Sequence, residues 1–363
     1  MEAPVPCLLD LNLAPFALLD GCLRVRMTRT LAGNGSFAIT VRAQAGMRPE
    51  PGATFIYSRE PFGFTGLVTH VRGQEDEAGR KNLRISGTEA SFLLARRTIL
   101  PQPNALAGPA ESVMKQLLAL NAGAAAGMAR RLAIIEAEDD GARGPEVTFA
   151  GWNSNLLAAL SKLAQESGTG FRLDLDTVRK KLIFRCIAGT DRSAAQDAFP
   201  RALFSIGYNT ACQVRLDMES EDSANLVYLL GRNNEGVRET VPLWSGDEPA
   251  GAERREAVCE AGSVPRERYG TYGWQKLQRW SQTEAITVSV QERSPLAENR
   301  DFALGDTCSI DIRNVWHDAQ LTAVTDTWNG LRWRKELFFG MQRRTALARL
   351  SEKTDELWEA LQA

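Results

Sequence analysis

The sequence predicts a mainly β protein of the α+β class, in which two antiparallel β regions flank a small α/β unit and a helix ends the chain. Two observations carry this prediction. Apolar and polar residues alternate in short runs before about residue 95 and again after about residue 200, which is typical of half-buried strands. Between these regions the apolar spacing becomes helical, so we expect four parts: 1–100, 101–200, 201–340 and 341–363.

The first part, residues 1–100, carries period-two alternation in the runs 23–28, 37–42 and 83–86. Turn-forming clusters separate these runs at 33–35, 49–52 and 77–79. One buried and one wet face is typical of antiparallel strands. Several short strands at this spacing indicate a small barrel or sandwich.

The second part, residues 101–200, is expected to contain two helices followed by a hairpin. The first helix should open at Pro109 and end near Gly123, and the second should follow Asn153 and end at Gly168. Alternation in the runs 171–175 and 182–186 then predicts two paired strands.

In the third part, residues 201–340, alternation returns in the runs 214–219, 286–291 and 308–313. The run 225–231 is expected to be a strand buried on both faces, and a helix over about 266–283 should interrupt the strands. Residues 341–363 predict a C-terminal helix with a heptad-like leucine seam at Leu347, Leu350, Leu357 and Leu361. The seam is too short to decide between docking on the protein itself or a neighbour and a three-stranded bundle.

Two stretches of the sequence resemble each other. A strand-like run, a hairpin turn and a second run ending in glycine occur at 64–87 and again at 319–340. Leu67 to Gly87 spans 20 residues and Leu321 to Gly340 spans 19. This similarity is either a chance likeness of two hairpins or a duplication of one barrel on both sides of the α/β unit.

Composition excludes several classes of function. The 363 residues contain 43 Lys and Arg against 45 Asp and Glu, so the net charge of -2 gives no overall affinity for nucleic acid, although a local basic patch remains open. No apolar run is long enough to cross a bilayer, and the N-terminus shows no secretory signal, so we expect a protein made in a cytoplasm.

The sequence also offers little for catalysis. The six cysteines lie at least 15 residues apart, which excludes a Cys-x-x-Cys ligand pair and favours free thiols. The two histidines are His70 and His317, and neither a Gly-x-Ser-x-Gly elbow nor a phosphate-binding glycine loop is present. We therefore predict no catalytic, cofactor-binding or metal-binding residues.

The order of several segments resembles a known family. These segments are 35–37, 61–66, 87–89, 93–97, 99–101, 301–306, 324–328 and 339–340. In this order the sequence resembles the tail hub (baseplate hub) proteins of long-tailed bacteriophages, especially the siphovirus gene-product-37-like tail proteins. The resemblance covers about residues 1 to 340, and no single motif within it is specific.

The resemblance implies two tail-tube-like β-barrels that flank an α/β domain. It implies a structural protein of the virion, at the tail tip or baseplate and assembled in the host cytoplasm. Three copies would form a ring with pseudo-six-fold symmetry that closes the distal end of the tail tube and adapts six-fold to three-fold symmetry. The implied partners are other copies, a distal tail or tail tube protein, the tape-measure protein, and tip, spike or fibre proteins. DNA would pass only transiently through the lumen, and no membrane insertion is implied.

Candidate contact residues follow from this interpretation. Aromatic side chains are enriched at protein interfaces, and the leucine seam could meet a helix or a neighbour. We therefore predict interface positions at Trp316, Trp328, Trp333, Phe338, Leu347, Leu350, Leu357 and Leu361. Basic pairs that could face the lumen or an interface are Arg96, Arg97, Arg343 and Arg344. Competing hypotheses are a tail-associated peptidase or cell-wall hydrolase, a receptor- or glycan-binding tip protein, and a secretion-system hub.

Overall fold

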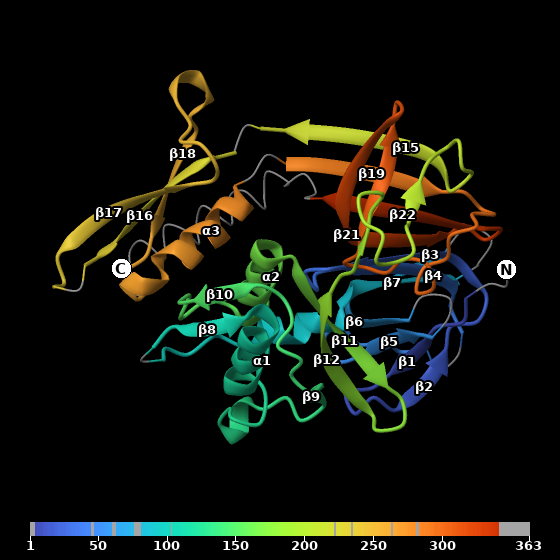
Figure 1. Cartoon of the computed structure of the whole chain (residues 1–363). Helices are drawn as coiled ribbons and strands as arrows, with labels where there is room; N and C mark the ends of the chain where they lie inside the picture. The colour runs from blue at the N-terminus through green and yellow to red at the C-terminus, as the bar shows by residue number, and fades with distance from the viewer. Residues whose placement is uncertain are drawn as a thin grey trace.

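The computed structural model describes residues 4–44, 47–59, 63–75, 81–102, 104–220, 223–233, 235–262, 264–280 and 283–340. Within these residues the chain is mainly β, as the sequence predicts, and one large sheet runs through most of it (Figure 1). The predicted C-terminal helix lies outside the described residues, together with Arg343, Arg344 and the leucine seam.

The large sheet joins strands from both ends of the chain. Its strand order is β15-β19-β22-β21-β3-β4-β7-β6-β5-β1-β2. The N-terminal strands are β1 (Cys7–Leu9), β2 (Pro15–Leu18), β3 (Cys22–Thr30), β4 (Ser36–Arg42), β5 (Phe55–Ser58), β6 (Phe64–Glu75) and β7 (Lys81–Glu89). The C-terminal strands are β15 (Ala211–Glu219), β19 (Thr283–Val290), β20 (Thr307–Ile312), β21 (Val315–Trp328) and β22 (Trp333–Gly340). The short strands β13 (Asp191–Arg192) and β14 (Leu203–Phe204) pair parallel with β20.

The sheet contains the same pairing pattern twice. In the N-terminal repeat, strands β3 to β7, the antiparallel pairs are β3–β4, β4–β7, β7–β6 and β6–β5. In the C-terminal repeat, strands β15 and β19 to β22, they are β15–β19, β19–β22, β22–β21 and β21–β20. The two similar hairpins of the sequence are β6–β7 and β21–β22, and they occupy equivalent places in the two pairing patterns.

Irregularities in the two repeats also coincide. The register of β6 and β7 shifts between Val68 and His70, and that of β21 and β22 shifts between Leu321 and Ala323. At the first strand of each repeat, shifts occur between Cys22 and Arg24 in β3 and between Ala211 and Gln213 in β15. Because a bulge fixes which residues face which, these shifts align the two repeats residue by residue.

Each repeat has its own core. The N-terminal core includes Phe37 and Ile39, and the C-terminal core includes Ile286, Ile310 and Phe339. In β3 the alternation predicted from the sequence is visible, since Val25 and Met27 are buried while Arg24 and Arg26 are exposed. Within the described residues the strand order is an open path and shows no closed barrel.

The α/β insert, residues 106–188, lies between the two repeats in the chain. It contains β8 (Leu106–Pro109), α1 (Ala110–Asn121), β9 (Ile135–Ala137), β10 (Glu146–Phe149), α2 (Leu156–Ser167), β11 (Thr169–Asp176) and β12 (Lys181–Ala188). Short 3-10 helices precede it at η1 (Ala90–Arg96) and occur within it at η2 (Met128–Arg130). Both predicted helices and the hairpin are present. Asn155 caps α2 at its start, and Gly168 in the left-handed conformation ends it.

A second inserted unit separates β15 from β19. This α3 unit, residues 224–280, consists of β16 (Leu226–Arg232), β17 (Arg238–Trp244), η3 (Gly251–Glu253), β18 (Glu256–Glu260), η4 (Arg266–Arg268) and α3 (Tyr269–Arg279). Its three strands form a separate sheet, with β16 in the middle, and it stands apart from the large sheet in Figure 1. The sequence indicated the helix but not the separate sheet.

Strand β16 corrects one expectation. Val227 and Leu229 are fully buried in the core that includes α3, whereas Tyr228 and Leu230 on the other face are only half-buried. The run is therefore not buried on both faces, because α3 covers just one side of this small sheet.

Candidate functional site

The joint between the two repeats is the main structural site of the chain. Strand β3 pairs antiparallel with β21 from Thr30 opposite Ala323 to Val25 opposite Trp328. The hydroxyl groups of Thr28 and Thr325 meet across this joint at 2.8 Å. The joint turns two repeats, far apart in the sequence, into one continuous sheet.

Tryptophan side chains reinforce the joint. Trp328 ends β21 and is buried in the core of the N-terminal repeat, where its ring lies 5.2 Å from that of Trp333. The hairpin of the C-terminal repeat thus contributes its tip to the core of the other repeat. In this structure both predicted contact residues pack inside the chain.

A buried cluster of charged side chains lies at the joint. Arg29 on β3 pairs with Glu298 and with Asp326 on β21, each at 2.7 Å, and Lys335 on β22 pairs with Asp326 at 2.7 Å. Burial disfavours the charged guanidinium, yet Glu298 and Asp326 raise the pKa of Arg29 above its usual range. Burial alone would also raise the pKa of Glu298, but Arg29 and Lys335 outweigh it and lower that pKa. The charged forms of Arg29 and Glu298 are therefore favoured, and the cluster links both repeats.

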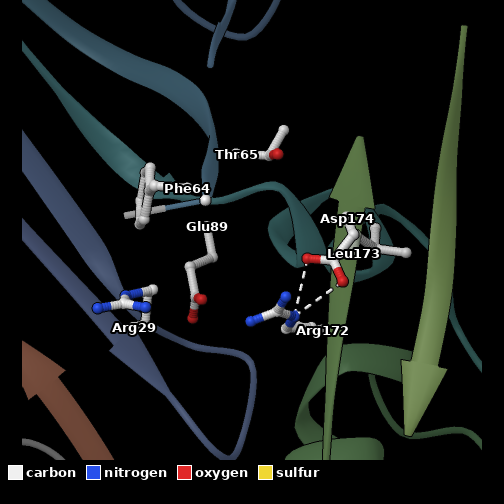
Figure 2. A pocket seen from close by; sticks show the side chains of 8 residues that line it. Arg29, Phe64, Thr65, Glu89, Arg172, Leu173 and Asp174 are labelled. Carbon is white, nitrogen blue, oxygen red and sulfur yellow. Dashed lines mark hydrogen bonds and ion pairs between the residues drawn. The ribbon is translucent and has the colours of Figure 1, made fainter. Parts of the chain in front are cut away.

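Glu89 is a second buried carboxylate at the same place. Figure 2 shows it extending from β7 toward Arg29, with Arg172 and Asp174 of β11 on its other side. Its Oε2 atom accepts hydrogen bonds from the backbone nitrogens of Gly35 at 2.6 Å and Thr30 at 3.4 Å. Burial raises the pKa of Glu89 to about 7, although these hydrogen bonds and Arg29 act in the opposite direction.

A raised carboxyl pKa in a pocket is a common sign of general acid or base catalysis. The cavity beside Glu89, however, holds only about 10 Å³. That is room for about one water molecule, so a substrate cannot reach the carboxyl. The geometry of Glu89 thus fits a structural role at the meeting point of β3, β7 and the insert.

Arg29 and Glu89 were not predicted as site residues, although the burial phase of their strands carries a signal for both. In β3 the buried phase runs through Val25 and Met27 and reaches Arg29, and in β7 it runs through Ile85 and reaches Glu89. A charged residue at a buried position of an alternating strand must be paired to be stable. If the alternation of buried and exposed positions is continued to the end of each strand, it predicts that Arg29 and Glu89 are buried and therefore paired.

Two other predicted contact residues lie nearer the surface. Trp316 near the start of β21 is 39% exposed and stacks on Tyr208, with ring centroids 6.0 Å apart. Phe338 on β22 is half-buried. Trp316 therefore remains available to a partner in this structure.

The predicted basic pair lies on the rim of the insert. Arg96, Arg97 and Arg130 line a surface hollow of about 310 Å³. Arg96 donates to the carbonyl oxygen of Gly52 and Arg97 to that of Arg130, each at 2.7 Å. The structure thus brings Arg96 and Arg97 together with a third arginine that the sequence analysis did not select for this site.

The described residues contain neither a candidate metal-binding cluster nor a candidate membrane-spanning helix. No group of three or more His, Cys, Asp or Glu side chains there is arranged to hold a metal ion. His317 pairs with Glu284 at 2.7 Å. In the same part of the chain, no helix has both the length and the apolar character that crossing a bilayer requires.

Comparison with known proteins gives the class of this fold. The model of the family described as "Siphovirus ReqiPepy6 Gp37-like protein" matches residues 7–340. No curated protein matches the sequence. Among solved structures, the chain is similar to the 43 kDa tail protein of prophage MuSo2 from Shewanella oneidensis, with a TM-score of 0.60 and 11% identity over 92% of this chain and 98% of that one.

Two further structures have the same fold. The tail protein from Neisseria meningitidis MC58 gives a TM-score of 0.58 at 12% identity, covering 94% of this chain and 97% of that one. The prophage tail protein gp18 from Listeria monocytogenes EGD-e gives 0.56 at 12% identity, covering 99% and 100%. The fold is thus that of phage tail proteins. The chain belongs to the siphovirus Gp37-like family, which confirms the resemblance drawn from its sequence.

Proposed function

We propose that this protein is a non-enzymatic hub of a phage tail. Three copies form a ring that closes the distal end of the tail tube and adapts its six-fold symmetry to a three-fold tip. The β3–β21 joint is the observation that carries this proposal. It sets two similar units side by side in one sheet, so three chains present six quasi-equivalent units.

Each repeat corresponds to one tail-tube-like barrel domain in this proposal. In this proposal the chain divides into 1–100, 101–200, 201–340 and a C-terminal segment 341–363, and the separate cores of the two repeats support the distinction between the first and third parts. The core of the α/β insert also includes Leu9, Phe55 and Leu67 of the first part. The separate core of the α3 unit adds a further body within 201–340.

The ring has two faces with different partners in this proposal. One face takes a distal tail or tail tube protein, and the other takes tip, spike or fibre proteins. The tape-measure protein and, transiently, DNA occupy the lumen, which the basic pair Arg96 and Arg97 or other arginines would line. The protein resides in the virion after assembly in the host cytoplasm.

The mass of the purified protein in solution tests this proposal. We expect a species of three times the chain mass by native mass spectrometry, with a central opening in negative-stain images. A protein that stays monomeric at high concentration and hydrolyses peptides or cell-wall fragments would contradict it. Trp316→Ala supplies an interface test, since loss of this exposed ring should weaken binding to a partner without unfolding the chain.

A further inference from the structure

Besides the terminal strand β2, two edges of the large sheet have no strand partner among the described residues. One is the outer side of β15, which pairs only with β19. The other is the second half of β6, since β5 pairs with β6 only from Phe64 to Leu67. Beyond that point His70, Arg72, Gly73 and Glu75 are all exposed. In Figure 1, β15 lies along the outer edge of the sheet.

The equivalent edges inside the chain are already paired with each other. In β21, the counterpart of β6, the first half pairs with β20 and the second half, Ala323 to Trp328, pairs with β3. Strand β3 is in turn the counterpart of β15. The free half of β6 and the free side of β15 are therefore the two sides of a joint that the chain forms once internally and leaves open at its ends.

We propose that β6 of one copy pairs antiparallel with β15 of the next copy, in the register of the internal β3–β21 joint. The inference rests on the proposed ring and names its contact. The matching bulges set the alignment, with His70 equivalent to Ala323 and Gln213 equivalent to Arg24. This alignment places Val71 opposite Met218, Arg72 opposite Asp217, and Gly73 opposite Leu216.

The side chains at these positions are complementary. Arg72 and Asp217 carry opposite charges, and their internal equivalents are Thr325 and Thr28, which meet at 2.8 Å. On the other face, Val71 meets Met218, a methionine that is 56% exposed in the isolated chain. A shift of one residue would place Arg72 opposite Met218 and mix the charged with the apolar face.

Pairing at this joint also explains how the edges are protected. A free strand edge is a template for uncontrolled association, and neither β15 nor the second half of β6 is covered in the described part of the chain. In a ring of three, three internal joints would alternate with three joints between copies. All six would share one register, which is what a three-fold ring needs to match a six-fold tube.

Paired cysteines test the register directly. In a Cys212→Ser background, which removes the exposed thiol of β15, we would make V71C/M218C and R72C/D217C. Because β6 and β15 are opposite ends of the eight-strand run, a disulfide between them joins two copies. The control is V71C/D217C. Its two cysteines are one residue out of the proposed register and face opposite sides of the sheet.

After mild oxidation, non-reducing gels should show covalent dimers and trimers for at least one matched pair and several-fold less for the control. Native mass spectrometry of the reduced proteins separates the two proposals. A trimer without matched links would overturn the β6–β15 pairing but not the ring. Equal linking in the control would overturn the register, and a monomer without links would overturn both.

Charge reversal gives a second, non-covalent test. R72D or D217R alone should reduce the assembled fraction several-fold, because each places like charges opposite one another. The double variant R72D/D217R should restore it. Both side chains are exposed, so folding of the chain is expected to persist. Failure of the double variant to recover assembly, with both single variants impaired, would contradict the pairing of these two residues.

Discussion

At the scale of single residues, the buried carboxyl of Glu89 should make stability depend on pH. Its pKa of about 7 in the folded chain lies above the ordinary value of 4.5, so the folded state holds a proton that the unfolded state has released. The free energy of unfolding should therefore fall as pH rises from about 4.5 to about 7, by about 3 kcal/mol in total. Glu89→Gln should remove this slope, measured as urea unfolding at several pH values.

The surface change Glu50→Gln is the matched control for the lost charge. It should leave the pH profile of the wild-type protein in place. If E89Q and the wild-type protein show parallel profiles between pH 4.5 and 7.5, the carboxyl of Glu89 is not the titrating group.

Arg29 makes a second prediction at this scale. Arg29→Met keeps the length of the side chain but leaves Glu298 and Asp326 buried with only Lys335 as partner. Removing one member of a buried ion cluster costs about 3–5 kcal/mol. Chemical denaturation should show this loss, and adding Asp326→Asn should recover part of it. A loss below 1 kcal/mol would mean that the cluster does not hold the repeats together.

At the scale of elements, a buried ion pair fastens the α3 unit to the insert. Glu166 on α2 pairs with Lys276 on α3 at 2.7 Å and accepts a hydrogen bond from Gln275 at 2.5 Å. Burial would raise the pKa of Glu166, but Lys276 and Lys162 outweigh it and lower that pKa. Glu166 is therefore ionised at neutral pH, and the contribution of its contact with Lys276 should be lost as the pH falls below 4.5 toward the lowered pKa of Glu166.

Glu166→Ala should loosen this one unit. We expect faster hydrogen exchange in α3 and in β16 to β18, while β3, β4 and β7 exchange as in the wild-type protein, because their cores are separate. Exchange read by mass spectrometry checks this, with the exposed neighbour Gln165→Ala as control. Equal acceleration in β3, β4 and β7 would show that the two bodies unfold together.

Individual strands and helices could be predicted from the sequence, but the pairing of distant strands could not. Period-two runs predicted β3, β4 and β7, and the cap residues Asn155 and Gly168 lie at the ends of a predicted helix, because these signals are local. Strand β17 was missed since Pro242 interrupts its pattern, which an edge strand tolerates. The β3–β21 pairing could not be predicted, because alternation fixes which face is buried and not which strand is the neighbour.

At the scale of the whole molecule, the segment beyond β22 should serve assembly more than folding. The four described cores are built from residues between Leu8 and Phe339, so we expect a chain ending at residue 340 to keep its melting temperature within about 3 °C of the full chain. The leucines at 347, 350, 357 and 361 are spaced for contact with a helix or a neighbour. We therefore expect the truncated chain to fold but to form fewer trimers at equal concentration, measured by native mass spectrometry beside calorimetry.

A milder variant, with these four leucines changed to serine, separates the apolar seam from the basic residues Arg343 and Arg344. Ring formation unchanged in both proteins would contradict a role for this segment and leave the strand edges as the sole proposed contact between copies.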